Sequence, residues 1–128
     1  MKLIPVGFQN DKANEHLPFS VIYERAFSES GFTPQLTMML NLIRYLENEV
    51  DALTHWVCTS HLGLVFYNKD FEIYGKGCSE ALMLYAGIAE GKPDSYQIQQ
   101  IGIRTTNNVK IAGEWIRQIL QSPKNVYV

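Results

Sequence analysis

The chain has 128 residues and a formal net charge of −2, with 46% hydrophobic and 19% charged residues. This length fits one domain, residues 1–128, and the composition is typical of a globular protein rather than a disordered one. Charges of both signs are scattered and no basic cluster is present, which argues against binding to the phosphates of nucleic acid.

The first elements predicted along the chain are a strand and a helix. Residues 2–6 form a short apolar run, and Pro5 suits an edge strand because proline cannot donate to a ladder. From Pro18 onward the apolar residues recur at helical spacing, and Gly31 provides a stop.

The strongest pattern is that of a second helix, which starts at Thr33 and continues to Leu53. Thr33 offers a cap and Pro34 suits the first helical position. Apolar residues follow at steps of three and four: Leu36, Met39, Leu40, Ile43, Leu46, Val50 and Leu53. The other side carries Arg44, Glu47, Asn48, Glu49 and Asp51, so we expect this charged face to lie in water.

Strand-forming residues come next. The run of residues 56–59, Trp56-Val57-Cys58-Thr59, favours a strand. Two aromatic and β-branched runs, residues 64–67 and 71–74, flank a short polar connection, which is a hairpin signature near residues 63–75.

Residues 81–89 have almost no polar face, which predicts a helix buried on more than one side. Beyond it, Tyr96 alternates with Ile98, and Ile101 alternates with Ile103 in the opposite phase. This shift predicts either a bulge between the two pairs or two short strands.

The last predicted helix begins near Thr106 and stops before Pro123. Its buried residues are expected to be Val109, Ala112, Trp115, Ile116, Ile119 and Leu120. Residues 125–128 are a candidate for a terminal strand. The predicted fold is therefore α+β, a single domain in which an antiparallel or mixed sheet is covered by about four helices.

No run of residues approaches the roughly 20 consecutive apolar residues of a transmembrane helix. Pro5 interrupts the apolar start of the sequence, which therefore does not fit a signal peptide. We expect no membrane insertion and a cytoplasmic location, where Cys58 and Cys78 are reduced thiols.

The stretch Tyr74-Gly75-Lys76-Gly77-Cys78-Ser79-Glu80 has the layout of a phosphate-binding turn before a helix. Glu80 takes the third glycine position of the dinucleotide fingerprint, and no glycine-lysine pair is followed by serine or threonine as in a P-loop. If Ser79 caps the helix, Glu80 occupies the positive helix end and repels a phosphate. We therefore expect no cofactor.

Around Gly77 the same turn resembles the pyrophosphate-binding turn of acyl-CoA-dependent N-acyltransferases. The coarse order of the predicted elements is also similar to that superfamily's. The resemblance covers only the turn from Gly75 to Glu80 and departs from the family pattern at Ser79, which replaces a small apolar residue. It implies an acyl-CoA-binding enzyme that uses this turn.

His55, Cys58 and His61 are residue types that bind zinc. On a helix they would share a face with Asp51, whereas on a strand successive members point to opposite faces. The same residues are also candidates for a cysteine nucleophile with a histidine base. Because we expect a strand here, we predict no metal site and no catalytic residue, but a buried thiol beside surface histidines.

The carboxylates define a possible acidic patch for protein binding, with one aromatic residue beside it: Glu47, Glu49, Asp51, Asp70, Glu72 and Tyr74. This patch favours a non-catalytic protein-binding domain of the inhibitor or immunity type, which covers a basic partner such as a toxin or nuclease. The alternative is a small-ligand binder or an N-acyltransferase-like enzyme. A homodimer through surface aromatics such as Trp56 is compatible with both hypotheses.

Overall fold

The structure is a computed structural model that describes residues 1–5, 17–29, 31, 33–50, 53–67, 82–100 and 102–121, apart from the side chains of residues 82 and 83. Its elements, in chain order, are β1 (Lys2–Pro5), α2 (Phe19–Phe27), α3 (Thr33–Asn48), β2 (Thr54–Ser60), β3 (Gly63–Tyr67), β4 (Leu82–Ala89), β5 (Lys92–Gln99), β6 (Ile103–Thr106) and α5 (Val109–Gln121). The α+β class is confirmed. The described residues form three helices, so the expected fourth helix is not confirmed.

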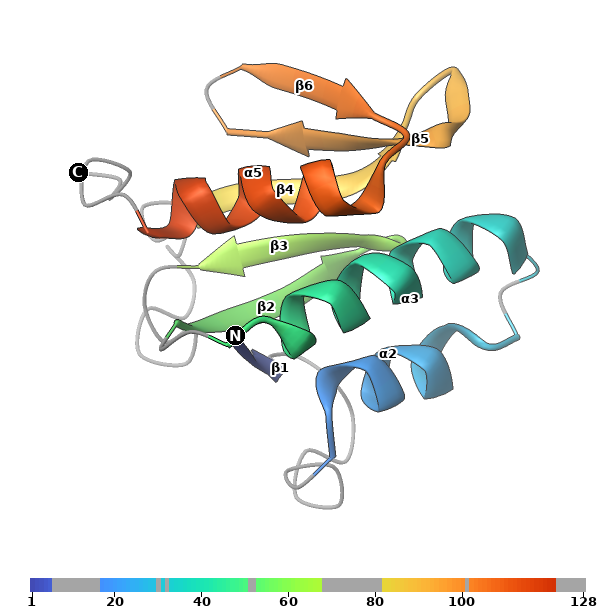
Figure 1. Ribbon diagram of the computed structural model, residues 1–128. Coiled ribbons are helices and arrows are strands. Elements are labelled where there is room, and N and C mark those ends of the chain that lie inside the picture. Colours follow the sequence, from blue (N-terminus) through green and yellow to red (C-terminus); the bar gives the residue numbers. More distant parts are fainter. Residues whose placement is uncertain are drawn as a thin grey trace.

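The six strands form one mixed sheet in the order β1-β2-β3-β4-β5-β6. β1 pairs with β2 in parallel, and each later pair is antiparallel. Figure 1 shows α3 and α5 side by side across the sheet, with α2 next to α3. One face of the sheet and the inner sides of the helices therefore share a single core.

The core follows the alternation of side chains along each strand. Eight strand residues are buried on the helix-covered face: Leu3, Val57, Leu64, Phe66, Leu84, Ala86, Tyr96 and Ile98. The helices contribute buried residues at steps of three and four, among them Phe19, Ile22 and Tyr23 from α2, Met39, Leu42, Ile43 and Leu46 from α3, and Ala112, Ile116, Ile119 and Leu120 from α5. The predicted amphipathic helices α2, α3 and α5 are thus confirmed.

The second helix ends earlier than its pattern predicts. α3 stops at Asn48, and Val50, expected on its apolar face, is 99% exposed. The chain must turn here, because Thr54 already pairs with Lys2 at the start of β2. Val50 therefore does not pack against the core, whereas Leu53, which lies beyond the helix, does.

The prediction of a helix over residues 81–89 is wrong, because Leu82–Ala89 forms the strand β4. This strand pairs with β3 on one side and with β5 on the other. Leu84 and Ala86 are buried on the helix-covered face, while Tyr85 on the opposite face is half-buried. A short run that is apolar on both faces fits a central strand as well as a buried helix, and periodicity does not separate the two.

Gly91 is part of the tight turn from β4 to β5, where Ala89 pairs with Lys92 and Gly91 has a φ of 75°. After β5, the second of the two predicted alternatives is confirmed, because β5 and β6 are two short strands that pair from Gln99 with Ile103 onward.

The predicted hairpin near residues 63–75 is described only in its first arm. That arm, β3, pairs with β2 on one edge and with β4 on the other. The expected second arm, residues 71–74, and the candidate strand of residues 125–128 lie outside the described residues.

Candidate functional site

The glycine turn from Gly75 to Glu80 lies outside the described residues. The helix that it was expected to begin is instead the strand β4. A strand has no macrodipole comparable to a helix's, so residues 82–89 supply no positive helix end to bind a pyrophosphate or to be occupied by Glu80. The expected repulsion of a phosphate by Glu80 depended on that helix and is therefore unsupported.

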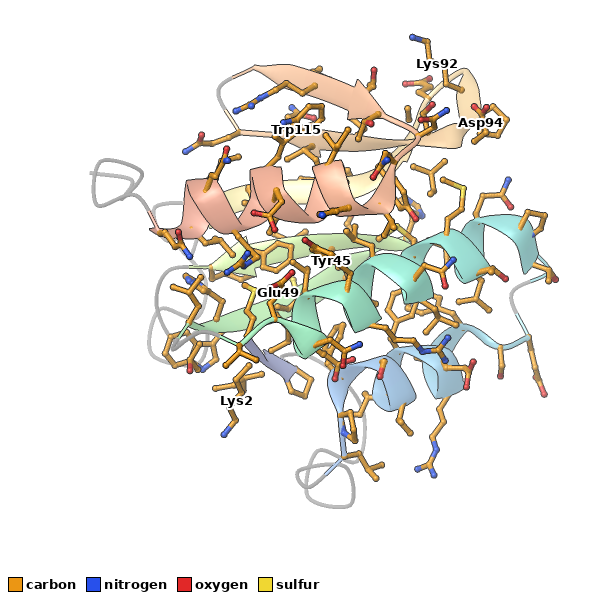
Figure 2. All side chains as sticks on the ribbon, viewed as in Figure 1. Lys2, Tyr45, Glu49, Lys92, Asp94 and Trp115 are labelled. Carbon is orange, nitrogen blue, oxygen red and sulfur yellow. The ribbon has the colours of Figure 1, made fainter. Side chains whose placement is uncertain are left out.

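Of the predicted acidic patch, only Glu47 and Glu49 are described; Asp51, Asp70, Glu72 and Tyr74 lie outside the described residues. Glu49 lies where α3 meets α5, and its Oε2 atom is 3.5 Å from Arg117 Nη1 (Figure 2). Glu47 lies on α3 toward β1 and α2, where it lines a groove. The two carboxylates therefore lie in different surroundings.

The candidate metal or nucleophile residues are separated, as a strand requires. His55 and Val57 face the helices, whereas Cys58 is on the opposite face of β2. His55 is buried, with Nδ1 3.3 Å from the carbonyl oxygen of Tyr67, so the expectation of a surface histidine is wrong at this position. His61 is exposed in the turn after β2.

The thiol of Cys58 is half-buried, with Sγ 3.3 Å from the Tyr67 hydroxyl. Within the described ranges, no group of three or more histidine, cysteine, aspartate or glutamate side chains is placed to hold a metal ion.

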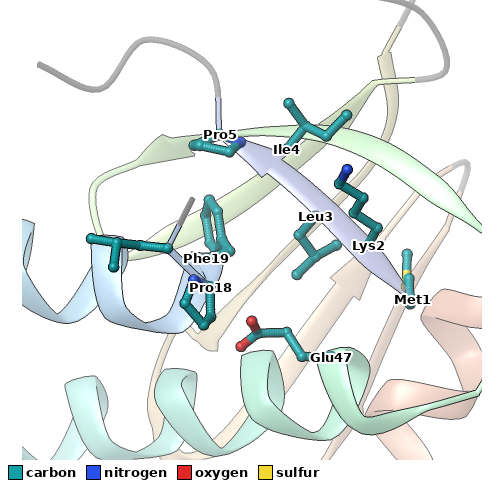
Figure 3. Close-up of a pocket in the computed structure, with 9 residues that line it drawn as sticks. Met1, Lys2, Leu3, Ile4, Pro5, Pro18, Phe19 and Glu47 are labelled. Carbon is teal, nitrogen blue, oxygen red and sulfur yellow. The ribbon is translucent and has the colours of Figure 1, made fainter. Parts of the chain in front are cut away.

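A groove of about 530 Å³ lies beside the edge strand β1. We call it the β1 groove. It is lined by Met1, Lys2, Leu3, Ile4, Pro5, Leu17, Pro18, Phe19 and Glu47. Figure 3 shows β1 along one side and the start of α2, with Pro18 and Phe19, facing it, while Glu47 reaches in from α3. The site is thus assembled from three segments that are distant in sequence.

The β1 groove is lined by both apolar and polar groups. Leu3 is 7% exposed and Phe19 is 1% exposed, so both side chains belong mainly to the core behind the groove. Pro18 precedes α2 and holds a φ of −59° and a ψ of 147°, which brings the chain into the helix in an extended conformation. The accessible apolar lining is provided by residues that are not buried, such as Ile4, Pro5 and Pro18.

Among the described lining residues, Glu47 is the one with an acidic side chain. Within the described part of the chain it forms no ion pair, and in Figure 3 the Lys2 side chain points away from its carboxylate. Glu47 thus contributes a negative charge to the lining of the groove.

The backbone of β1 adds hydrogen-bonding groups to the same groove. Lys2 N donates to Leu53 O at 2.8 Å, and Lys2 pairs with Thr54. In a parallel ladder the N–H and C=O of one residue point to the same side and those of the next residue point away. The N–H and C=O of Leu3 therefore point away from β2, to the outer edge of the sheet.

Sequence reasoning identified Glu47 and the edge character of β1, but it missed Leu3, Pro18 and Phe19 as parts of a site. The sequence features near these residues were a proline in a predicted strand and a proline at the start of a predicted helix. Neither signal shows that the two elements face each other across a hollow.

None of the described helices is long and apolar enough to cross a membrane. No family model matches the sequence, and no curated protein or solved structure is significantly similar to it. The function is therefore argued from the geometry of the site alone.

Proposed function

We propose that the protein is a non-catalytic protein-binding domain that takes up an extended segment of a partner protein along the outer edge of β1. The observation that carries this proposal is the position of the β1 groove, directly beside a sheet edge on which no other described strand pairs. Addition of a strand to such an edge is a recurrent mode of peptide recognition.

The main chain of β1 sets how the partner segment pairs. Leu3 offers one donor and one acceptor outward, and the carbonyl group of Pro5 offers a second acceptor. Pro5 has no N–H to offer. The bound segment therefore makes a short ladder centred on Leu3, and the affinity depends on the side chain that it places in the groove.

That side chain is basic. The accessible apolar lining of the groove, which includes Ile4, Pro5 and Pro18, suits the aliphatic stem of a lysine or arginine. The carboxylate of Glu47 suits the charged end. A basic partner also agrees with the negative net charge of −2. The finer proposal is an inhibitor or immunity-type protein that covers a basic toxin or nuclease, as complementary charge speeds association with such a partner.

Backbone-methylated peptides test the strand addition without changing the protein. The probe is a capped, β-forming peptide with one central lysine, and binding is followed by amide chemical shifts of Leu3 and of residues in β2. Methylation of the peptide nitrogens that face β1 should abolish binding, whereas methylation of the alternate nitrogens should leave it unchanged. Equal effects of the two methylation patterns would exclude a ladder with β1.

Glu47→Gln tests the charge in the groove. It should weaken the lysine peptide about two- to fivefold, less so at high salt, and leave a peptide with central norleucine unaffected. Glu24→Gln is the matched control, because Glu24 lies on α2 outside the groove, 3.7 Å from Arg44 in an exposed ion pair. A lysine peptide that binds both variants with equal strength would contradict the assignment of Glu47.

A further inference from the structure

We propose that a second hollow, at the turn between β2 and β3, is a binding site for a small uncharged molecule made of one ring and one hydrogen-bonding group. The hollow has a volume of about 310 Å³ and is lined by Gln35, His61, Leu62, Gly63, Tyr85 and Ile88. We call it the Tyr85 pocket. None of its described lining residues also lines the β1 groove.

Two glycines leave room for the phenol ring of Tyr85 at this pocket. Gly63 lies opposite Gly87 across the β3–β4 ladder, one step beyond the pair of Leu64 with Ala86. A Cβ atom at Gly63 would be 2.2 Å from the Tyr85 hydroxyl oxygen, and one at Gly87 would be 2.5 Å from it. The phenol therefore lies over the bare backbone of this glycine pair. Glycine weakens a strand interior and often marks such a close approach.

The hydroxyl of Tyr85 has no hydrogen-bond partner among the described residues. Within the described part of the chain it forms no hydrogen bond, although the side chain is half-buried. Burial raises the pKa of Tyr85, so the phenol remains protonated and acts as a donor. A partly buried hydroxyl that lacks an acceptor gains free energy when a ligand supplies one.

The turn that forms the other wall is anchored from behind. The Tyr23 hydroxyl, on a side chain with 0% exposure, donates to Leu62 O at 2.5 Å. His61 in the same turn has a φ of 55°, a left-handed conformation that costs energy for a residue other than glycine. The exposed imidazole of His61 forms part of the lining of the pocket.

The lining residues define the chemical class of the ligand. Leu62 and Ile88 are apolar, and the polar groups are an amide, an imidazole and a phenol. No lysine, arginine, aspartate or glutamate is among the described lining residues, so a charged ligand would be desolvated without a counter-charge. The volume is at the lower end of small-molecule sites, which suits a single ring bearing an amide or carbonyl group.

Benzamide is the probe for this site, with benzylamine as a charged molecule of similar size. In a two-dimensional amide NMR titration up to about 10 mM, the range expected of a weakly bound fragment, benzamide should shift the signals of His61, Leu62, Gly63 and Ile88. Benzylamine should not shift them. If the same signals fail to move with benzamide, or move equally with benzylamine, the proposed ligand class is wrong.

Tyr85→Phe removes only the hydroxyl and should weaken benzamide about three- to tenfold, the loss expected of one hydrogen bond. Because this hydroxyl has no described partner, the variant should unfold at the same denaturant concentration as the parent protein. Tyr45→Phe, the same change on α3 away from the pocket, should leave benzamide binding intact. Unchanged affinity in Tyr85→Phe would overturn the role of Tyr85.

Discussion

Tyr45 on α3 donates a hydrogen bond from its hydroxyl to Glu114 Oε1 on α5, over a distance of 2.6 Å. Arg117 Nη1 lies 3.0 Å from the same oxygen and 3.5 Å from Glu49 Oε2. The two helices that lie side by side over the sheet are thereby joined by a small polar cluster. The hydrogen bond from Tyr45 is the largest cause that lowers the pKa of Glu114, and Arg117 lowers it further.

Tyr45→Phe should make the protein less stable at neutral pH, and the loss should vanish in acid. A carboxyl whose folded pKa is lowered contributes stability above its unfolded pKa of 4.5, and this contribution is lost as the pH falls through the folded pKa. The free energy of unfolding in urea, measured from neutral pH downward, should therefore converge for parent and variant.

Tyr96→Phe is the control for this pH dependence. The Tyr96 hydroxyl donates to the carbonyl oxygen of Met38 at 2.8 Å, and a carbonyl group does not titrate. Its stability loss should stay constant over the pH range in which that of Tyr45→Phe disappears. A constant loss in both variants would contradict the coupling of Tyr45 to the charge of Glu114.

Gly113→Ala should destabilise the protein although alanine is the better helix former. A Cβ atom at this position of α5 would lie 2.3 Å from two carbons of the Tyr45 ring. The overpacking cost of about 1–3 kcal/mol exceeds the helix-propensity gain of roughly 1 kcal/mol. Urea unfolding measures the net effect. Gly102→Ala should be close to neutral, because nothing lies within 4 Å of a Cβ atom at that position. If Gly113→Ala is as stable as Gly102→Ala, the contact with the Tyr45 ring is refuted.

Gly87→Ala should lower the free energy of unfolding by roughly 1–3 kcal/mol, because the new methyl group meets the Tyr85 phenol. In a Tyr85→Ala background the same change should cost much less, since the ring is gone. A double-mutant cycle in urea measures this coupling. Additive losses would mean that the phenol does not lie over Gly87.

Asn108→Ala should cost about 1 kcal/mol, because Asn108 caps α5. Its Oδ1 atom accepts hydrogen bonds from Lys110 N at 2.9 Å and from Ile111 N at 3.1 Å. Asn108→Asp keeps these acceptors and adds a favourable charge at the helix start, so it should retain the stability. Thermal and urea unfolding compare the variants; equal losses for alanine and aspartate would argue against capping.

The helices could be predicted from the sequence because their apolar residues recur at the spacing of a helix that is buried on one side. α3 and α5 show this spacing over several turns, and Thr33 and Pro34 mark where α3 begins. β4 could not be predicted, because its residues are apolar on both faces, so the run lacks the period-two alternation that distinguishes a strand from a buried helix. The neighbours β3 and β5 that cover its edges are set by the fold and not by local pattern.

The site was less accessible to sequence reasoning than the fold. Glu47 was selected for its charge and lines the β1 groove, whereas Glu49, selected on the same ground, pairs with Arg117. Spacing along α3 shows that both are on the polar side but not which neighbour each one meets. Phe19 reads as an ordinary core residue, and only tertiary packing shows that it also walls a groove.

β1 also has a consequence for the order in which the molecule assembles. Its neighbour in the sheet is β2, which the chain reaches only after two helices, whereas every other described pair joins strands that follow each other. Closing the longest loop for a ladder of only four residue pairs is the least favourable step in chain entropy, so β2 to β6 can pair before β1 docks. The strand that carries the proposed ladder would then be the last to settle and the first to detach, and its amide protons should exchange with solvent sooner than those of the sheet centre.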